Sequence, residues 1–161
     1  MAAHYPVPIQ EDVRDLLVDL LGRGVAADKV PALELEEDSP AAIAEFVTDA
    51  DETACLCIID GKFGVRVGAA LVMVPSTVAE ESVTKNELPD HHLENVREVV
   101  NIFGRMLNSA STPHVRLADL HRWPGELPDG VTALLAAPEY RRDFAVQVDG
   151  YGEGRFSLLV S

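Results

Sequence analysis

Glu98 and Asn101 stand three residues apart in the stretch LENVREVVNIFGRMLNSASTP, residues 93–113. The apolar residues of this stretch recur every three or four positions, which predicts a helix. Side chains at positions i and i+3 project from one helical face, so the carboxylate and the carboxamide would lie together. Both groups form hydrogen bonds, and a pair of them on one exposed face could act on a molecule outside the helix.

The predicted helix begins with Asp90 as its N-cap and ends near Asn108. On a helical wheel, one half of it is apolar and consists of Leu93, Val96, Val99, Val100, Phe103, Met106 and Leu107. The other half holds Glu98 and Asn101 together with the candidate partner-binding residues, which are Glu94, Arg97, Gly104, Arg105 and Asn108.

The polar half of this helix is not optimised for helix stability. Glu94 and Glu98 are like charges one turn apart. Asn101 has a poor helix propensity, and an exposed glycine at position 104 costs about 1 kcal/mol relative to alanine. Either this face meets a partner that approaches the backbone at Gly104, or it is a solvated face that has drifted neutrally. The sequence leaves both interpretations open.

Histidines and cysteines do not predict a metal site. His91, His92 and Glu94 cluster at the start of the helix, but neighbouring side chains point about 100° apart on a helix and cannot share one metal. Cys55 and Cys57 lie in an apolar run with no second pair, so we interpret them as small buried hydrophobic residues.

Two glycine-containing segments do not match nucleotide-binding loops. GKFGVRVG, residues 61–68, follows a predicted strand and opens a helix, but Lys62 is not followed by Ser or Thr and comes after the first glycine. GYGEG, residues 150–154, lies between two predicted strands, where glycines serve turn geometry.

Composition and charge limit the classes of function. Residues 1–161 suit a single domain, and hydrophobic residues make up 47% of the chain, as in ordinary globular proteins. The net charge of −14 disfavours nucleic acid and anionic membrane surfaces as partners, because phosphate binding needs Lys and Arg. No run approaches the roughly 20 apolar residues of a membrane span, and no signal peptide is visible, so we expect a cytoplasmic protein.

The remaining elements predict an α+β fold, a largely antiparallel sheet with helices on one face. Helices are expected at residues 9–21, 63–74, 77–86 with Ser76 as the cap, and 129–137. Strands are expected at residues 32–36, 43–47, 54–59 and 114–118, and in a C-terminal hairpin around residues 150–154. The run 54–59 has no polar face and should form a central strand. No internal repeat is visible.

Glu98-Val99-Val100-Asn101 on a long amphipathic helix resembles the Glu-x-x-Asn motif of the CheC/CheX/FliY phosphatases. The order of the elements is CheX-like over roughly residues 9–161. This resemblance implies removal of phosphate from the aspartyl phosphate of a CheY-like response regulator. It implies that Asn101 orients the attacking water, that Glu98 pairs with the lysine of the regulator, and that Mg²⁺ belongs to the regulator, so that this chain needs no cofactor of its own. With one Glu-x-x-Asn on a plausible helix, a two-site CheC-like arrangement is not expected.

A second hypothesis is a non-catalytic binding or dimerisation module, regulatory or chaperone-like, that keeps the fold without the chemistry. A homodimer is compatible with the edge strand of an antiparallel sheet. The environment of Asn101 separates the two hypotheses: an outward, unpaired side chain favours the phosphatase, and a side chain held by hydrogen bonds within the chain favours the module.

Overall fold

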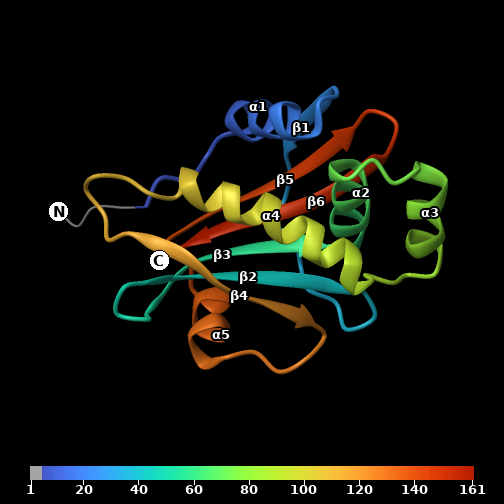
Figure 1. The fold of residues 1–161 in the computed structure, drawn as a ribbon. Helices are drawn as coiled ribbons and strands as arrows, with labels where there is room; N and C mark the ends of the chain where they lie inside the picture. The colour runs from blue at the N-terminus through green and yellow to red at the C-terminus, as the bar shows by residue number, and fades with distance from the viewer. Residues whose placement is uncertain (1–4) are drawn as a thin grey trace.

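The computed structural model describes residues 5–161, which form one six-stranded antiparallel sheet and five helices. The strands are ordered β1-β5-β6-β3-β2-β4 across the sheet (Figure 1). The helices are α1 (Gln10–Leu21), α2 (Gly61–Leu71), α3 (Ser76–Thr84), α4 (Asp90–Met106) and α5 (Asp129–Ala136). The strands are β1 (Val25–Lys29), β2 (Ala41–Thr48), β3 (Thr53–Asp60), β4 (Val115–Trp123), β5 (Tyr140–Val148) and β6 (Gly152–Val160). The predicted fold class is confirmed.

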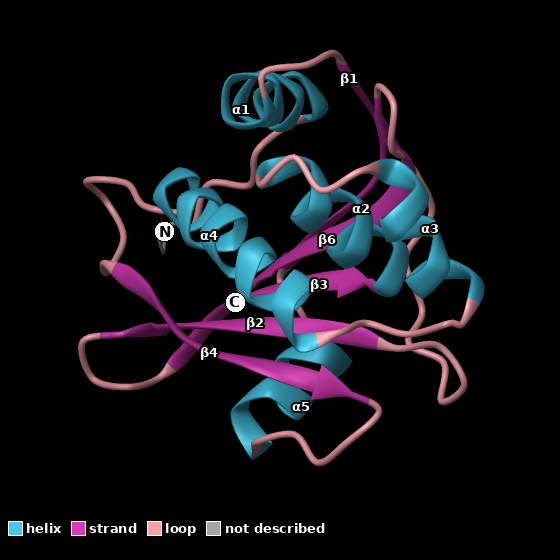
Figure 2. Ribbon diagram, turned by 45° about the vertical axis from the view of Figure 1, so that its right-hand side comes forward, coloured by secondary structure: helices cyan, strands magenta, loops and turns pink. Residues whose placement is uncertain are grey.

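The sheet is covered on both faces, but unequally (Figure 2). The larger core lies between the sheet and the helices α1 to α4, and Phe103 of α4 stacks on Phe156 of β6 with ring centroids 5.0 Å apart. The smaller core lies on the opposite face, where α5 packs Val131 and Leu134 against the sheet. Most helices therefore share one face as predicted, while α5 closes the other.

In each half of the chain a helix precedes three strands, and in the second half α5 is inserted between β4 and β5. Helix α1 precedes β1, β2 and β3, and helix α4 precedes β4, β5 and β6. The first strand of each half pairs with the second strand of the other half, and the two third strands, β3 and β6, pair at the centre. The sheet thus has a two-fold topology in which α1 is the counterpart of α4, although the sequence shows no repeat.

Local periodicity located most elements correctly. The hairpin of β2 and β3 is confirmed, and β3 is a central strand buried on both faces, with Cys55 and Cys57 as free buried thiols. Burial raises the pKa of the Cys55 thiol to about 12, which agrees with its interpretation as an inert core residue. The C-terminal hairpin of β5 and β6 is confirmed as well.

Three local expectations are wrong. Residues 32–36 do not form a strand; their leucines, Leu33 and Leu35, pack against the smaller core, and the edge strands of the sheet are β1 and β4. Ser76 and Asp90 are not N-caps, because both are the first residues of their helices and the preceding prolines occupy the cap positions. Proline without an amide hydrogen is well tolerated at a helix start, where the N–H groups lack helical partners.

Along residues 5–161 no helix is both long enough and apolar enough to cross a membrane.

Candidate functional site

Helix α4 is fixed on the sheet by its apolar face and at both of its ends. Its buried side chains are Leu93, Val96, Val99, Val100 and Phe103, with Leu107 just beyond the last turn, essentially the predicted stripe. At the start of α4, Arg122 of β4 donates to the Leu88 carbonyl at 2.8 Å and pairs with the Asp90 carboxylate. These contacts hold the exposed face of α4 in one orientation.

The exposed face of α4 carries Glu94, Arg97, Glu98, Asn101 and Arg105. Among the described residues, none of these five side chains has a hydrogen bond, an ion pair or a ring contact. Asn101 therefore points into solvent with a free carboxamide. Of the two arrangements that separate the hypotheses, the structure has the outward, unpaired one.

Gly104 does not belong to this exposed face. It is buried, and a Cβ atom at this position would lie 2.6 Å from Cε1 of Phe46, whose ring is fully buried under α4. The expectation of an exposed Gly104 open to a partner is wrong. The aromatic ring of Phe46 in β2 fills the space next to Gly104, which a helical wheel places on the solvent side. The glycine instead allows the close approach of α4 to the sheet.

We expect Gly104→Ala to destabilise the protein by about 1–3 kcal/mol, because the added methyl group overpacks a core position and displaces either Phe46 or the helix. The gain in helix propensity, about 1 kcal/mol, offsets only part of this cost. Urea unfolding measures the difference. A more stable Gly104→Ala variant would contradict the tight contact with Phe46.

Asn108 is also used within the chain. Its amide nitrogen donates to the carbonyls of Gly104 at 3.2 Å and Val115 at 3.1 Å, and its Oδ1 accepts from the Val115 amide at 2.8 Å. The side chain thus joins the end of α4 to the start of β4, and it is not free for a partner. Asn108 was predicted to be on the partner-binding face from its place on the wheel, which does not reveal contacts after the helix has ended.

A shallow hollow of about 200 Å³ lies beside the free face, between α4 and β4. Leu93 and Leu120 contribute its apolar part, and Asp90, Glu94 and Arg97 form its polar edge. Leu120 comes from β4, so no pattern within the helix could have placed it here. Two of the residues at this hollow, Glu94 and Arg97, also belong to the exposed face that carries Asn101.

His92 lies on the buried side of α4. It is 1% exposed, and its Nδ1 atom is buried with no hydrogen-bond partner among the described residues. No group of three His, Cys, Asp or Glu side chains in residues 5–161 is arranged to hold a metal ion.

Burial, and to a smaller extent the neighbouring His91, lowers the pKa of His92 below its usual value of 6.5.

This lowered pKa makes stability depend on pH. The unfolded chain binds a proton at His92 more readily than the folded chain, so the contribution of His92 is fully present above about pH 6.5 and is lost as pH falls toward the lowered folded-state pKa. We expect the free energy of unfolding to decrease between pH 7 and pH 5, and His92→Phe to flatten this decrease. The matched variant His91→Gln, at the exposed neighbour, should keep most of this decrease, because burial is the larger cause of the lowered pKa. A pH dependence in His92→Phe equal to that of the wild type would contradict the assignment.

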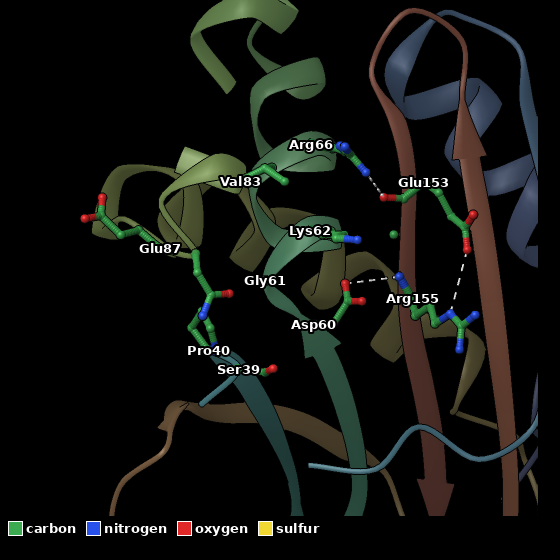
Figure 3. Close-up of a pocket in the computed structure, with 12 residues that line it drawn as sticks. Ser39, Pro40, Asp60, Gly61, Lys62, Arg66, Val83, Glu87, Glu153 and Arg155 are labelled. Carbon is green, nitrogen blue, oxygen red and sulfur yellow. Dashed lines mark hydrogen bonds and ion pairs between the residues drawn. The ribbon is translucent and has the colours of Figure 1, made fainter. Parts of the chain in front are cut away.

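The two glycine segments meet at a second hollow, of about 530 Å³, at the start of α2 (Figure 3). Gly61 and Lys62 line it from α2, and Gly154 and Arg155 line it from β6. A Cβ on Gly154 would lie 2.4 Å from the Phe63 backbone, so this glycine permits the close contact between β6 and α2.

Two charged residues of this hollow, Arg66 and Asp60, have partners within the chain. Arg66 forms two hydrogen bonds with the Glu80 carboxylate, at 2.8 and 3.1 Å, and donates to the Glu153 carbonyl. Asp60 accepts from the Phe63 and Arg155 amides, and despite these bonds burial raises the pKa of its carboxyl. These contacts of Arg66 and Asp60 join α2 to α3 and to β6.

No protein-family model matches the sequence, and no curated protein sequence matches it. Solved structures do match the fold. Thermotoga maritima FliY is 15% identical, with 94% of this chain and 89% of that chain covered and a TM-score of 0.56. FliM in the FliM–SpeE complex from H. pylori is 7% identical, with 94% and 80% covered and a TM-score of 0.62. FliM in the FliG–FliM complex from H. pylori is also 7% identical, with 94% and 85% covered and a TM-score of 0.58.

These similarities cover nearly the whole chain, and at such low identity they establish the fold alone. The chain has the α+β fold of FliY and FliM, and it presents Glu98 and Asn101 on the exposed face of α4 with no partner among the described residues.

Proposed function

We propose that this protein binds the phosphorylated receiver domain of a CheY-like response regulator in the cytoplasm and hydrolyses its aspartyl phosphate. The observation that carries the proposal is the exposed position of Glu98 and Asn101 on α4, where neither side chain has a partner within residues 5–161, in a fold similar to that of FliY. An asparagine costs helix stability at such a position, so its placement on a rigidly held, exposed face is better explained by a contact outside the chain.

In the proposed reaction, the Asn101 carboxamide enters the receiver pocket and orients a water molecule toward phosphorus. The bond from the water oxygen to phosphorus forms as the bond from phosphorus to the aspartyl oxygen breaks, giving inorganic phosphate and a free carboxylate. Glu98 pairs with the lysine of the receiver and fixes the register of docking. An aspartyl phosphate is already reactive, so positioning one water can supply a large part of the acceleration.

In the proposed reaction the receiver domain is the substrate, and the Mg²⁺ ion belongs to it. This chain contributes no ligand to that metal. The role of the protein is to supply two side chains in a fixed geometry. The rigid attachment of α4 suits that role, because a misplacement of about 1 Å can reduce a rate by about 100-fold.

The second candidate function is a protein-binding module without catalysis. FliM, which has the same fold, is found in complexes with SpeE and with FliG. In this alternative the face of α4 binds a protein partner, and Glu98 and Asn101 contribute to recognition only.

Phosphate release and binding, measured on the same proteins, separate the two candidates. Receiver domains from the same genome are charged with acetyl phosphate, and phosphate release is followed with the wild type and with Asn101→Ala. Binding is measured separately with beryllofluoride-charged receivers. Acceleration that requires Asn101 supports the phosphatase. Binding without acceleration by the wild type would leave the binding module, and the absence of both would refute both candidates for receivers.

A further inference from the structure

Arg97 and Arg105 differ from the other arginines of the chain. Eight of the ten have a side-chain hydrogen bond or ion pair, with partners such as Asp15 for Arg14 and Asp51 for Arg116. Within residues 5–161, the side chains of Arg97 and Arg105 have none, and both are exposed. In a chain with a net charge of −14, two exposed guanidinium groups on one helix with no hydrogen bond or ion pair among the described residues call for an explanation.

The two arginines flank Asn101 symmetrically. They lie four residues before it and four residues after it, on the exposed face of α4. Each step of four residues advances about 6 Å along the helix axis and turns about 40° around it, so the three side chains form one gently curved row. The Cα atoms of Arg97 and Arg105 are therefore about 12 Å apart along the helix axis, with Asn101 midway between them.

Carboxylates near the row do not neutralise the arginines. Asp90, the acid at the start of α4, pairs with Arg122 of β4. Glu94 and Glu98 share the exposed face with Arg97 but form no ion pair with it, and no acid from β4 pairs with Arg97 or Arg105 among the described residues. Each guanidinium keeps its five N–H donors for an external acceptor, a geometry suited to carboxylates and phosphate.

We infer that Arg97 and Arg105 form a two-point clamp for an acidic protein surface, holding carboxylates on either side of the group that meets Asn101. The inference rests on the proposed function, in which that surface belongs to the phosphorylated receiver. The clamp positions the partner and speeds its association, since the rest of this protein repels an acidic surface. Screening over about 8 Å at physiological salt leaves the local attraction of the clamp dominant at contact.

The clamp is tested by charge reversal. In Arg97→Glu/Arg105→Glu, both sites repel the partner; in the matched control Arg14→Glu/Arg116→Glu, the net charge changes equally, but at exposed arginines on α1 and β4. The association rate with a beryllofluoride-charged receiver is measured by stopped flow at low and high salt. Circular dichroism checks that each variant is folded.

We expect Arg97→Glu/Arg105→Glu to lower the association rate by about 10-fold or more at low salt, and by less at high salt. The association rate of the control should stay within about 2-fold of that of the wild type. Its charge changes lie far from the proposed contact, and salt screens their electrostatic effect on the partner. At saturating protein, the loss of phosphate release should be smaller than the loss of association rate, since the clamp contacts no reacting atom.

Each outcome decides a separate point. Equal association rates for the clamp variant and the wild type, or an equal loss in the control, would overturn the clamp while leaving the phosphatase in place. A clamp-dependent association without phosphate release would uphold the clamp and refute the phosphatase. No association of the wild type with any receiver tested would overturn both.

Discussion

Asn101→Ala is expected to reduce receiver dephosphorylation by at least about 100-fold at saturating protein, because a positioned hydrogen-bonding group that acts on the transition state contributes 10²–10³-fold. Asn101 is exposed and has no partner among the described residues, so the substitution removes no contact within the chain. Alanine has the higher helix propensity, and the variant should therefore be slightly more stable than the wild type.

The matched control is Asn95→Ala, the same substitution on the same helix. Asn95 is half-buried and lies outside the row formed by Arg97, Asn101 and Arg105. It should keep nearly full activity, and binding of the beryllofluoride-charged receiver should survive in both variants. Equal activity of Asn101→Ala and Asn95→Ala would contradict a role for Asn101 in the reaction.

Asp143→Ala is expected to destabilise the fold by about 3 kcal/mol, because it leaves buried donors without their acceptor. Asp143 is 5% exposed and accepts from the Leu33 amide at 2.8 Å, from Arg141 at 2.9 and 3.0 Å, and from the Ser157 hydroxyl. Burial alone raises the pKa of this carboxyl, but the hydrogen bonds from Arg141, Leu33 and Ser157 outweigh it and leave the pKa below its usual value.

Urea unfolding of Asp143→Ala is compared with Asp28→Ala, an exposed aspartate on the edge strand β1. Asp28→Ala should change the free energy of unfolding by less than about 0.5 kcal/mol. Because the folded-state pKa of Asp143 is lowered, its stabilisation is present above about pH 3.8 and is lost as pH falls below that. A cost below about 0.5 kcal/mol for Asp143→Ala would contradict the assigned network.

Features set by local periodicity could be predicted from the sequence. The apolar stripe of α4 and the hairpin of β2 and β3 depend on residues close together in the chain, and both are confirmed. The segment 32–36 alternates like a strand, yet it is anchored by the Leu33 amide to the Asp143 side chain and by its leucines to the smaller core. Strand β1, VAADK, has no alternation and becomes a strand through its pairing with β5.

The candidate site could be predicted only in part, because helical periodicity does not reveal contacts between segments that are far apart in the chain. The wheel placed Arg97, Asn101 and Arg105 on the polar half of the helix, and the structure has them exposed, because exposure on one helix follows from its own periodicity. It misplaced Gly104, whose burial depends on the ring of Phe46 in β2, a contact between distant segments. The place of Leu120 beside α4 depends on the sheet in the same way.

The decisive measurement is the rate of phosphate loss from a receiver domain that has been charged with acetyl phosphate and freed of excess donor, with and without this protein. We predict a loss that becomes faster in proportion to the protein added, that saturates, and that returns to the intrinsic rate with Asn101→Ala. A rate that stays at the intrinsic value for a receiver that the wild-type protein binds would show that α4 recognises the receiver without acting on its phosphate.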